Sequence, residues 1–264
     1  MRAIILAAGQ GLRLQQADAE HVPKVLLRFG GQSLLERHLL LLRAVGVHEV
    51  VLALGFRRDM VEAERDRLRW QPRPEIVVNP RYTLGSMLTV DMAAGRMTQG
   101  GDVLLMDGDV LYDVRIARAL VGGAEGGNRI LLDRDFEAGE EPVKCCLRGG
   151  VVVEFRKRLP AGLQCDVIGE SVGFFRFNAA GARELCAIIR VYIARDEGHL
   201  PHEEAVRDLI LGSPRQIDVR DITGAPWIEI DFANDVVRAE REILPLLQST
   251  AAAVGRIAGT IPVR

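Results

Sequence analysis

Short apolar runs alternate with amphipathic stretches through the first 110 residues of the chain. Runs rich in Val, Ile and Leu predict strands at 2–6, 49–54, 75–78 and 102–106, and the 3.6-residue periodicity between them predicts helices at 33–45, 57–69 and 84–95. Ser33 and Glu36 form a capping-box pattern ahead of the first helix, and Gly46 ends it. This alternation predicts an α/β fold with a mainly parallel, twisted sheet and helices on both faces.

The second half of the chain is richer in predicted strands. They lie at 128–133, 143–148, 151–156, 167–177 and 226–231, with Arg148-Gly149-Gly150 as a tight hairpin turn, and helices are predicted at 179–196, 202–211 and near 233–247. We therefore expect one α/β domain with a first half at 1–110 and a β-rich second half at 111–248. The weakly patterned segment 249–264 is either a loose tail or an oligomer contact, so a homodimer stays an open alternative.

Composition narrows the class of partner. The net charge is −2, and the chain has 48% hydrophobic and 27% charged residues, an ordinary globular balance. It contains no block of basic residues, so nucleic acid and anionic membranes are not favoured partners, and no apolar run approaches the length of a membrane span. The four cysteines show no metal-binding spacing, which predicts reduced, mostly buried thiols in a cytoplasmic protein.

The loop after the first strand carries the strongest chemical signal. The apolar run ends in Ala7 and Ala8, and Gly9, Gly11 and Arg13 follow, with Pro23-Lys24 about ten residues later. Glycines let the backbone approach a ligand, and successive N–H groups in such a turn bind anionic oxygens. The two cations add fixed positive charge, so the segment predicts a site for a nucleoside triphosphate.

Two other glycine-rich sites fit the loop poorly. A dinucleotide fingerprint would place a third glycine where Leu14 stands and an acid about twenty residues further on, and neither is present. The G-x-x-x-x-G-K-[ST] spacing of a P-loop is also absent. A plain strand–turn–helix connection stays an open alternative.

Two acidic clusters predict a metal site. Asp107-Gly108-Asp109 follows the strand at 102–106 and should share an edge of the sheet with the glycine loop, where a carboxylate can hold Mg²⁺. Glu229 and Asp231 lie on one face of a later strand, and two like charges there are costly unless a cation compensates them. The alternatives are an ordinary Asp-Gly turn and a strand end that caps the next helix through Asp231 or Asn234.

These motifs resemble those of the sugar-phosphate and alcohol-phosphate nucleotidyltransferases, the MobA-like NTP transferases. Their signature L-A-A-G-x-G-x-R-L…P-K is matched by Leu6, Ala7, Ala8, Gly9, Gly11, Arg13, Leu14, Pro23 and Lys24. The resemblance covers about residues 1–240 and implies a Rossmann-like, glycosyltransferase-A-type fold. It also implies Mg²⁺-dependent transfer of a nucleotidyl group from an NTP to a phosphorylated or phosphonate small molecule, with release of pyrophosphate.

The resemblance also implies roles for individual residues. Asp109 and Asp231 would hold Mg²⁺, Arg13 would neutralise the leaving pyrophosphate, and Lys24 would contact the α-phosphate and the acceptor. Asp107 would orient water or ribose, and Tyr82 and Ser86 lie where these enzymes contact the nucleobase, although a helix start alone explains that turn. The implied acceptor-binding residues are Lys144, Lys157, Glu170 and Glu229.

Within this family the short chain and its two acidic segments look most like the cytidylyltransferases. CTP is therefore the expected nucleotide, with phosphocholine, inositol phosphate or 2-aminoethylphosphonate as the acceptor. A choline ammonium needs an aromatic cage, and with 5% aromatic residues only Trp227 and Tyr82 are ready candidates, so choline is not preferred. A UTP- or GTP-dependent sugar-1-phosphate nucleotidyltransferase, a non-catalytic nucleotide-sensing subunit and a dinucleotide-dependent oxidoreductase are the alternatives.

Overall fold

The computed structural model describes residues 1–14, 22–123, 127–137 and 139–247, and in this part of the chain a nine-stranded sheet forms the centre. Its main strand order is β10-β9-β11-β6-β1-β4-β5, with β8 paired to β11 and β12 paired to β8. The strands are β1 (Arg2–Ala7), β4 (Glu49–Leu54), β5 (Glu75–Val78), β6 (Val103–Asp107), β8 (Asn128–Asp133), β9 (Lys144–Arg148), β10 (Val151–Arg156), β11 (Val167–Phe177) and β12 (Ile217–Asp221). Strands β6, β1, β4 and β5 run parallel, whereas β11 is antiparallel to β6, β8 and β9.

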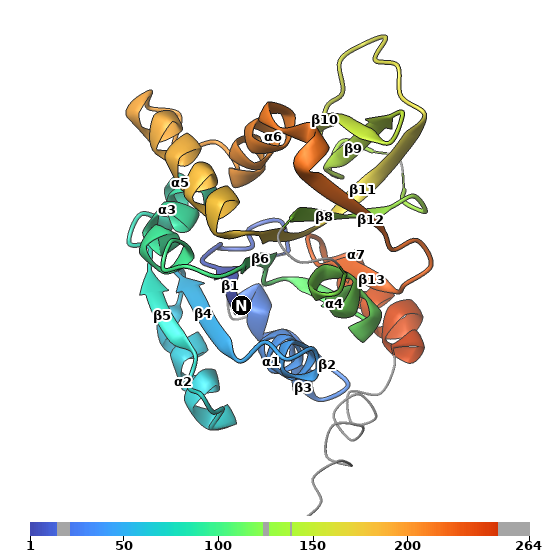
Figure 1. The fold of residues 1–264 in the computed structure, drawn as a ribbon. Helices are drawn as coiled ribbons and strands as arrows, with labels where there is room; N and C mark the ends of the chain where they lie inside the picture. Colours follow the sequence, from blue (N-terminus) through green and yellow to red (C-terminus); the bar gives the residue numbers. More distant parts are fainter. Residues whose placement is uncertain (15–21, 124–126, 138, 248–264) are drawn as a thin grey trace, which may run out of the picture.

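Helices cover both faces of the sheet (Figure 1). One face packs against α3 (Ser86–Met97), α5 (Ala179–Ala194) and α6 (His202–Gly212), and the other against α1 (Leu34–Ala44), α2 (Arg58–Leu68) and α4 (Val114–Val121). In β1 the side chain of Ile4 belongs to the first core, and those of Ala3 and Ile5 belong to the second. A strand covered on both faces needs apolar side chains at every position, which explains the unbroken apolar run at the start of the sequence.

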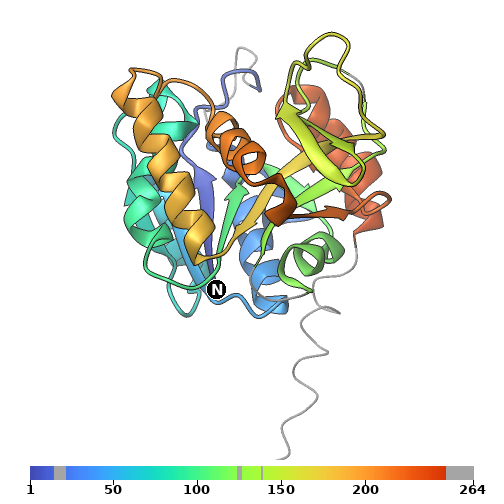
Figure 2. The same ribbon diagram turned by 45° about the horizontal axis from the view of Figure 1, so that its top comes forward.

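A smaller layer packs beside the main sheet. It contains β2 (Arg28–Phe29) paired with β3 (Gln32–Ser33), β7 (Val110–Tyr112) paired with β13 (Trp227–Glu229), and α7 (Ala233–Arg238), which continues into a π-helical turn (Ala239–Ile243) and a 3-10 turn (Leu244–Leu246). Phe29, Leu111 and Ile230 are buried in its own apolar cluster. At the far end of the main sheet β9 and β10 form a hairpin that packs against α6, and the loop from β10 to β11 extends beyond it (Figure 2).

The fold class and most of the predicted elements are confirmed. The predicted helix at 84–95 starts later, at Ser86, because Gly85 has a φ of 121° and separates it from a 3-10 turn at Tyr82–Leu84. The predicted strand at 226–231 is shorter and lies outside the main sheet, and the predicted helix near 233–247 changes hydrogen-bond pattern at Ala239 and Leu244. Sequence reasoning missed α4, β7 and β12, and the segment 249–264 lies outside the described residues.

The remaining sequence predictions concern the cysteines and the membrane. Cys145, Cys146 and Cys186 are buried and Cys165 is partly buried, and all four are free thiols, as predicted. Among the described helices, none combines the length and the apolar character that crossing a bilayer requires.

Candidate nucleotide-binding and transfer site

The glycine loop and the Asp107–Asp109 turn meet at the carboxyl edge of the sheet. Strands β1 and β6 are adjacent and parallel, so the segments that follow them leave from the same edge. The Gly108 N–H donates to the Leu6 carbonyl over 2.9 Å. A Cβ atom at Gly108 would lie only 2.7 Å from that carbonyl oxygen, so this close approach requires glycine. The sequence prediction that the two motifs share one edge is therefore confirmed.

A cavity of about 490 Å³ opens at this edge. Its volume lies in the range typical of small-molecule sites. It is lined by the described residues Leu6, Ala8, Gly9, Gln10, Gly11, Leu12, Arg13, Lys24, Tyr82, Thr83, Gly85, Ser86, Thr89, Asp107 and Asp109. Ala7 lines a smaller cavity beside it, together with Lys24 and Asp109. The structure thus brings together the residues that the sequence assigns to nucleotide binding, and it adds Gln10, Leu12, Thr83, Gly85 and Thr89 to the lining.

Three carboxylates converge next to this cavity. One oxygen each of Asp109, Glu229 and Asp231 lies within 4.8 Å of the others. The β7–β13 pairing produces this convergence, because Glu229 faces Val110 across the two strands and the Ile230 N–H donates to the Asp109 carbonyl over 3.0 Å. Burial among protein atoms and the charges of Asp109 and Asp231 raise the pKa of Glu229, although its side chain still reaches solvent.

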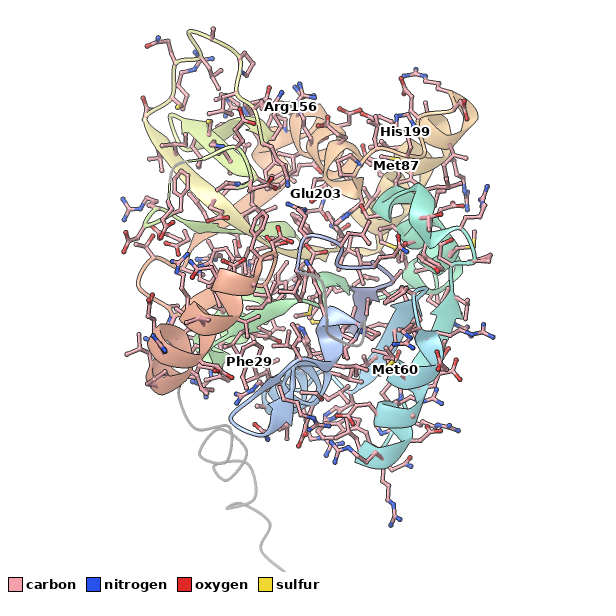
Figure 3. All side chains as sticks on the ribbon, turned by 180° about the vertical axis from the view of Figure 1, so that it is seen from behind. Phe29, Met60, Met87, Arg156, His199 and Glu203 are labelled. Carbon is pink, nitrogen blue, oxygen red and sulfur yellow. The ribbon has the colours of Figure 1, made fainter. Side chains whose placement is uncertain are left out.

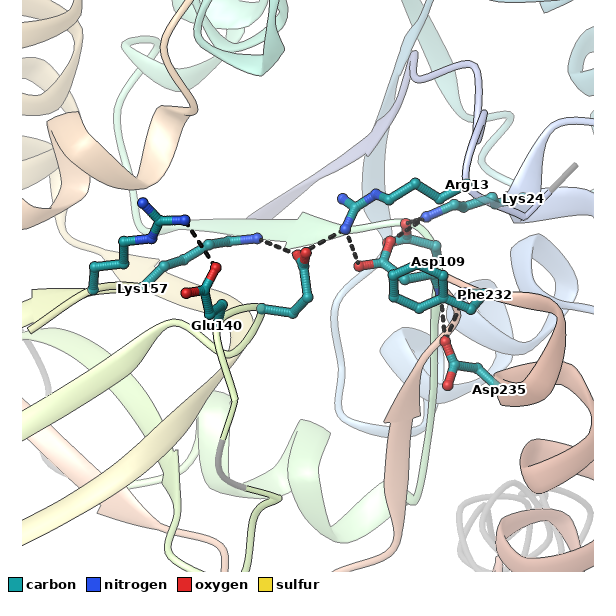
Figure 4. Close-up of polar contacts among 10 residues, drawn as sticks. Arg13, Lys24, Asp109, Glu140, Lys157, Phe232 and Asp235 are labelled. Atoms are coloured by element: carbon teal, nitrogen blue, oxygen red, sulfur yellow. Dashed lines mark hydrogen bonds and ion pairs between the residues drawn. The ribbon is translucent and has the colours of Figure 1, made fainter.

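A second set of contacts fixes the direction of Asp231. The carboxylate oxygen Oδ2 of Asp235, in the first turn of α7, accepts the N–H of Asp231 at 3.0 Å and the N–H of Phe232 at 2.7 Å. These bonds hold the turn between β13 and α7 (Figure 4). Asp235 stands in the segment that carries Glu229 and Asp231, but sequence reasoning gave it no role.

Lys24 and Arg13 neutralise the acidic cluster. The Lys24 ammonium lies 2.9 Å from Asp109 Oδ2 and 2.7 Å from Asp231 Oδ1. Burial alone would lower the pKa of Lys24, but the charges of the two aspartates outweigh it and raise that pKa. Arg13 lies 3.3 Å from Asp231 Oδ2, and its guanidinium also stands over the Phe232 ring, 5.5 Å from the centroid (Figure 4).

Asp107 lies apart from the three converging carboxylates. It ends β6 and faces the backbone of β11, where a Cβ atom at Gly173 would overlap its Oδ2. Burial raises the pKa of Asp107 to about 8, against the opposing charge of His202 and with the help of Glu203 and Asp109. The cluster that suits a metal therefore contains Asp109 and not Asp107, in line with the distinction drawn from the sequence.

A second cavity, of about 640 Å³, begins at Arg13. Its lining consists of charged side chains, namely Arg13, Glu140, Glu141, Arg156, Lys157, Arg158 and Glu204. Glu141 Oε2 lies 2.7 Å from the Arg13 guanidinium and 3.1 Å from the Lys157 ammonium, so one carboxylate joins the nucleotide side to the far side of the cleft (Figure 4). Arg13 lines both cavities, which makes them two parts of one cleft.

The predicted acceptor residues do not all lie in this second cavity. Lys157 lines it, whereas Lys144 donates to the carbonyls of Gly139, Pro142 and Lys157 at 2.6, 3.3 and 2.8 Å and so anchors the segment between β8 and β9. Burial and the charge of Asp133 raise the pKa of Glu170, on β11, to about 7. Neither Lys144 nor Glu170 lines the two cavities, and Glu229 lies with the metal-type acids.

His38 contacts the backbone of the Asp107–Asp109 turn, a contact that the sequence did not predict. It is buried on α1, with Nε2 3.2 Å from the Gly108 carbonyl and Nδ1 3.3 Å from the Tyr112 hydroxyl. Because a carbonyl only accepts, Nε2 carries the proton and Nδ1 accepts from Tyr112. Burial lowers the pKa of His38 to about 4, so the ring is neutral at physiological pH.

A glycine loop, converging carboxylates and two cations at the carboxyl edge of a parallel sheet define an α/β protein built to bind a nucleotide. The chain belongs to the MobA-like NTP transferase domain family, which matches residues 3–165. The predicted resemblance is therefore confirmed, and with it the predicted class of enzyme at the level of the family.

Individual relatives make the comparison more specific. The bifunctional IPC transferase and DIPP synthase of Rubrobacter xylanophilus is 31% identical over 92% of this chain and 52% of its own length. The CMP-5'-(3-aminopropyl)phosphonate synthase of Streptomyces rubellomurinus is 26% identical over 93% of this chain and 39% of its own length. The chain thus spans about half or less of the length of these two proteins. The inositol-1-phosphate CTP transferase of T. maritima has the same fold, with a TM-score of 0.70 and 20% identity over 99% of this chain and 98% of that one.

Proposed function

We propose that the protein transfers a cytidylyl group from CTP to a small molecule that carries a phosphate or a phosphonate, with release of pyrophosphate. The observation that carries this proposal is the position of Arg13, which lines both the cavity beside the glycine loop and the charged cavity beyond it. A triphosphate in the first cavity and an anionic acceptor in the second would meet beside Lys24 and the carboxylate cluster. The name of the Streptomyces rubellomurinus relative, a CMP-5'-(3-aminopropyl)phosphonate synthase, favours CTP among the nucleotides.

The reaction requires positioning and charge neutralisation rather than a covalent nucleophile. An oxygen of the acceptor attacks the α-phosphorus in line, the new P–O bond forms, and the bond to the β-phosphate oxygen breaks. In this proposal Lys24 would stabilise charge on the α-phosphate, and its position beside the carboxylates of Asp109 and Asp231 supports that role. Arg13 would neutralise the pyrophosphate that leaves, and its contact with Glu141 would then give way to that anion.

The carboxylates of Asp109, Glu229 and Asp231 fit a magnesium ion. They offer oxygen ligands within 4.8 Å of one another, and the ammonium of Lys24 between two of them indicates that this position favours a cation. When bound, Mg²⁺ would supply positive charge to the phosphate oxygens. The dependence of the reaction on Mg²⁺ is part of the proposal.

The second cavity indicates an anionic and highly polar acceptor. Arg156, Lys157 and Arg158 offer charge for a phosphate or a phosphonate, and Glu204 and Glu140 pair with two of these cations over 2.7 and 2.8 Å. Its lining contains only charged side chains among the described residues, so the aromatic cage that a choline head group requires is not formed there. Inositol phosphates and aminophosphonates fit this lining better than phosphocholine does.

Pyrophosphate release tests the proposal directly. We would combine the protein and Mg²⁺ with each of CTP, UTP, GTP, ATP and dTTP, and with phosphocholine, inositol 1-phosphate, 2-aminoethylphosphonate, 3-aminopropylphosphonate and several sugar 1-phosphates. Release with CTP and one polar acceptor, lost in Asp109→Asn, is the expected result. Release with UTP or GTP and a sugar 1-phosphate would replace CTP with the alternative nucleotide. A folded protein that binds CTP but releases no pyrophosphate with the whole panel would contradict catalysis.

A further inference from the structure

The starts of α3 and α6 are joined at the nucleotide cavity by one hydroxyl group. Ser86 Oγ accepts the backbone N–H of His202 over 3.0 Å, and the ring atom Nδ1 of His202 lies 3.1 Å from the same oxygen. Pro201, which precedes α6, offers no side-chain cap, so Ser86 satisfies that N–H from another helix. Figure 3 labels Met87 and Glu203, the neighbours of these two residues, where the helix starts meet.

The charge next to His202 decides which atom carries the proton. Glu203 Oε2 lies 3.0 Å from Nδ1, and an ionised carboxylate can only accept. Burial of His202 opposes its charge, but the charges of Glu203 and Asp107 outweigh burial and raise its pKa to about 9. The same ion pair lowers the pKa of Glu203 to about 2. Both ring nitrogens of the charged His202 therefore carry hydrogen, and the hydrogen on Nδ1 faces Ser86 Oγ and Glu203 Oε2, so Nδ1 cannot accept the hydroxyl hydrogen of Ser86.

This arrangement fixes the hydrogen-bond polarity of Ser86. A serine oxygen has two lone pairs, and both are taken by donors from His202. The single hydrogen of the hydroxyl is then left to donate, and Ser86 is half-buried in the lining of the nucleotide cavity, with Tyr82 and Thr89. A neutral His202 with hydrogen on Nε2 would have the opposite effect, because Nδ1 would consume the hydroxyl hydrogen.

We propose that His202 is a positioning residue for nucleotide selection, which holds the Ser86 hydroxyl as an obligatory donor to N3 of cytosine. N3 of cytosine accepts a hydrogen bond, whereas N3 of uracil carries a hydrogen and would face a second donor. O2 accepts in both bases and does not distinguish them. A buried polar group that is left unpaired by the wrong substrate is an effective basis for discrimination. The inference rests on the proposed function, and it assigns a role to a histidine that does not line the cavity.

A purely structural role predicts different behaviour. If His202 served only as the capped start of α6, its loss would lower stability and weaken every nucleotide alike. We would therefore measure the Kd of CTP and of UTP by titration calorimetry with Mg²⁺ present. The proteins compared are the wild type, His202→Leu, His202→Asn, Ser86→Ala and the double variant that combines His202→Leu with Ser86→Ala. Asn keeps an N–H donor near the Nδ1 position, whereas Leu keeps volume alone. Tyr192→Phe is the matched control, because it removes the 2.8 Å bond from α5 to Asp208 of α6, away from the cavity.

The expected result is selective and non-additive. His202→Leu should weaken CTP about tenfold and UTP much less, His202→Asn should restore most of the loss, and the double variant should bind CTP no more weakly than Ser86→Ala. Tyr192→Phe should lower the Tm and leave the ratio of the two Kd values unchanged. The inference is overturned if His202→Leu weakens both nucleotides equally, if its effect multiplies with that of Ser86→Ala, or if the wild type binds UTP as tightly as CTP.

Pyrophosphate release separates this inference from the proposed function. A protein with the predicted coupling that releases no pyrophosphate keeps the role of His202 and loses the proposed transfer. A protein that turns over CTP while the two substitutions act independently keeps the transfer and loses the positioning role. Absence of CTP binding in the folded wild type would overturn both.

Discussion

At the scale of single residues, Lys24 has the most demanding position in the cleft. Its ammonium lies within 3 Å of two carboxylates, in a group of three acids that would otherwise repel one another. The chain has only three lysines, and Lys157 lies further along the same cleft. A cation that balances these acids would have to release them when a metal and a triphosphate bind. In the proposed reaction Lys24 would therefore bind phosphate and also compete with the metal for Asp109 and Asp231.

Lys24→Met separates these two effects. Without the ammonium, turnover should fall about 10²- to 10³-fold because the charge on the α-phosphate is no longer stabilised. The affinity of the nucleotide-free protein for Mn²⁺ should rise, because nothing competes for Asp109 and Asp231. Pyrophosphate release and Mn²⁺ titration followed by electron paramagnetic resonance measure the two quantities. Lys157→Met is the control, and it should leave Mn²⁺ affinity unchanged; weaker Mn²⁺ binding in Lys24→Met would contradict the competition.

Sequence reasoning predicted the position of residues that depend on the local chain and missed contacts that depend on a distant partner. Asp109 and Arg13 lie in the loops that follow β6 and β1, so their place at the sheet edge could be predicted from the order of the elements. Glu141 and His202 carry no local signal, because their partners Arg13 and Ser86 lie more than 100 residues away in the chain. Lys144 shows the converse, since a lysine near the right strand is used to bind backbone carbonyls.

At the scale of elements, the short β7–β13 pair and the turn before α7 hold Glu229 and Asp231 beside Asp109, outside the main sheet. The turn between β13 and α7 is held by Asp235, whose carboxylate accepts the N–H of Asp231 and of Phe232. These elements could not be predicted in detail, because β7 and β13 have three residues each and their pairing joins segments that are distant in the sequence. α4 was missed although its apolar residues follow a helical period, since its eight residues are fewer than the stretch over which that period is normally sought.

Asp235→Ala should therefore weaken metal binding without removing a metal ligand. We expect the affinity for Mn²⁺ to fall about 10- to 100-fold, the usual cost of losing a residue that orients a ligand. The loss of the cap on α7 should lower the free energy of unfolding by only about 1 kcal/mol. Asp235→Asn keeps one carbonyl oxygen and should retain most of the affinity. Equal affinity in the wild type and the alanine variant would show that Asp231 needs no such support.

His38 of α1 should make the stability of the protein depend on pH through its contact with the Gly108 carbonyl. Its pKa is about 4 in the folded protein and 6.5 for an unperturbed histidine, so its contribution to stability is complete above pH 6.5 and is lost as the pH falls toward 4. The loss should amount to roughly 3 kcal/mol at most. Urea unfolding at several pH values between 4 and 7 measures it, with His38→Gln as the comparison, because Gln can donate to Gly108 but does not titrate. Parallel pH curves for the two proteins would rule out this link.

At the scale of the whole molecule, the first half of the chain (1–110) and the second half (111–247) share one sheet. Phe175 of β11 is fully buried and pairs with Leu105 of β6 and with Ile130 of β8, so it joins the two halves directly. The core on its side of the sheet takes residues from both halves, from Ile4 to Ile210. β6 belongs to the first half and β11 to the second, and each strand is paired with the other. Because neither half could bury its apolar side chains without the other, we expect the two halves to unfold together.

The two tryptophans allow this to be measured. Trp70 precedes β5 in the first half, where Arg43 stacks on its ring at 3.5 Å, and Trp227 lies in the second, where it donates to Asp133 over 2.7 Å. In urea, the fluorescence midpoint of Trp70→Phe and that of Trp227→Phe should each coincide with the circular dichroism midpoint of the same variant. Adding Phe175→Ala should cost about 3–5 kcal/mol and shift both midpoints equally, because the cavity lies in their common core. If Phe175→Ala shifted only the midpoint reported by Trp227, or if the circular dichroism transition became biphasic, the second half of the chain would be a separate folding unit. The geometry of the cleft would then depend on the docking of two units rather than on one continuous sheet.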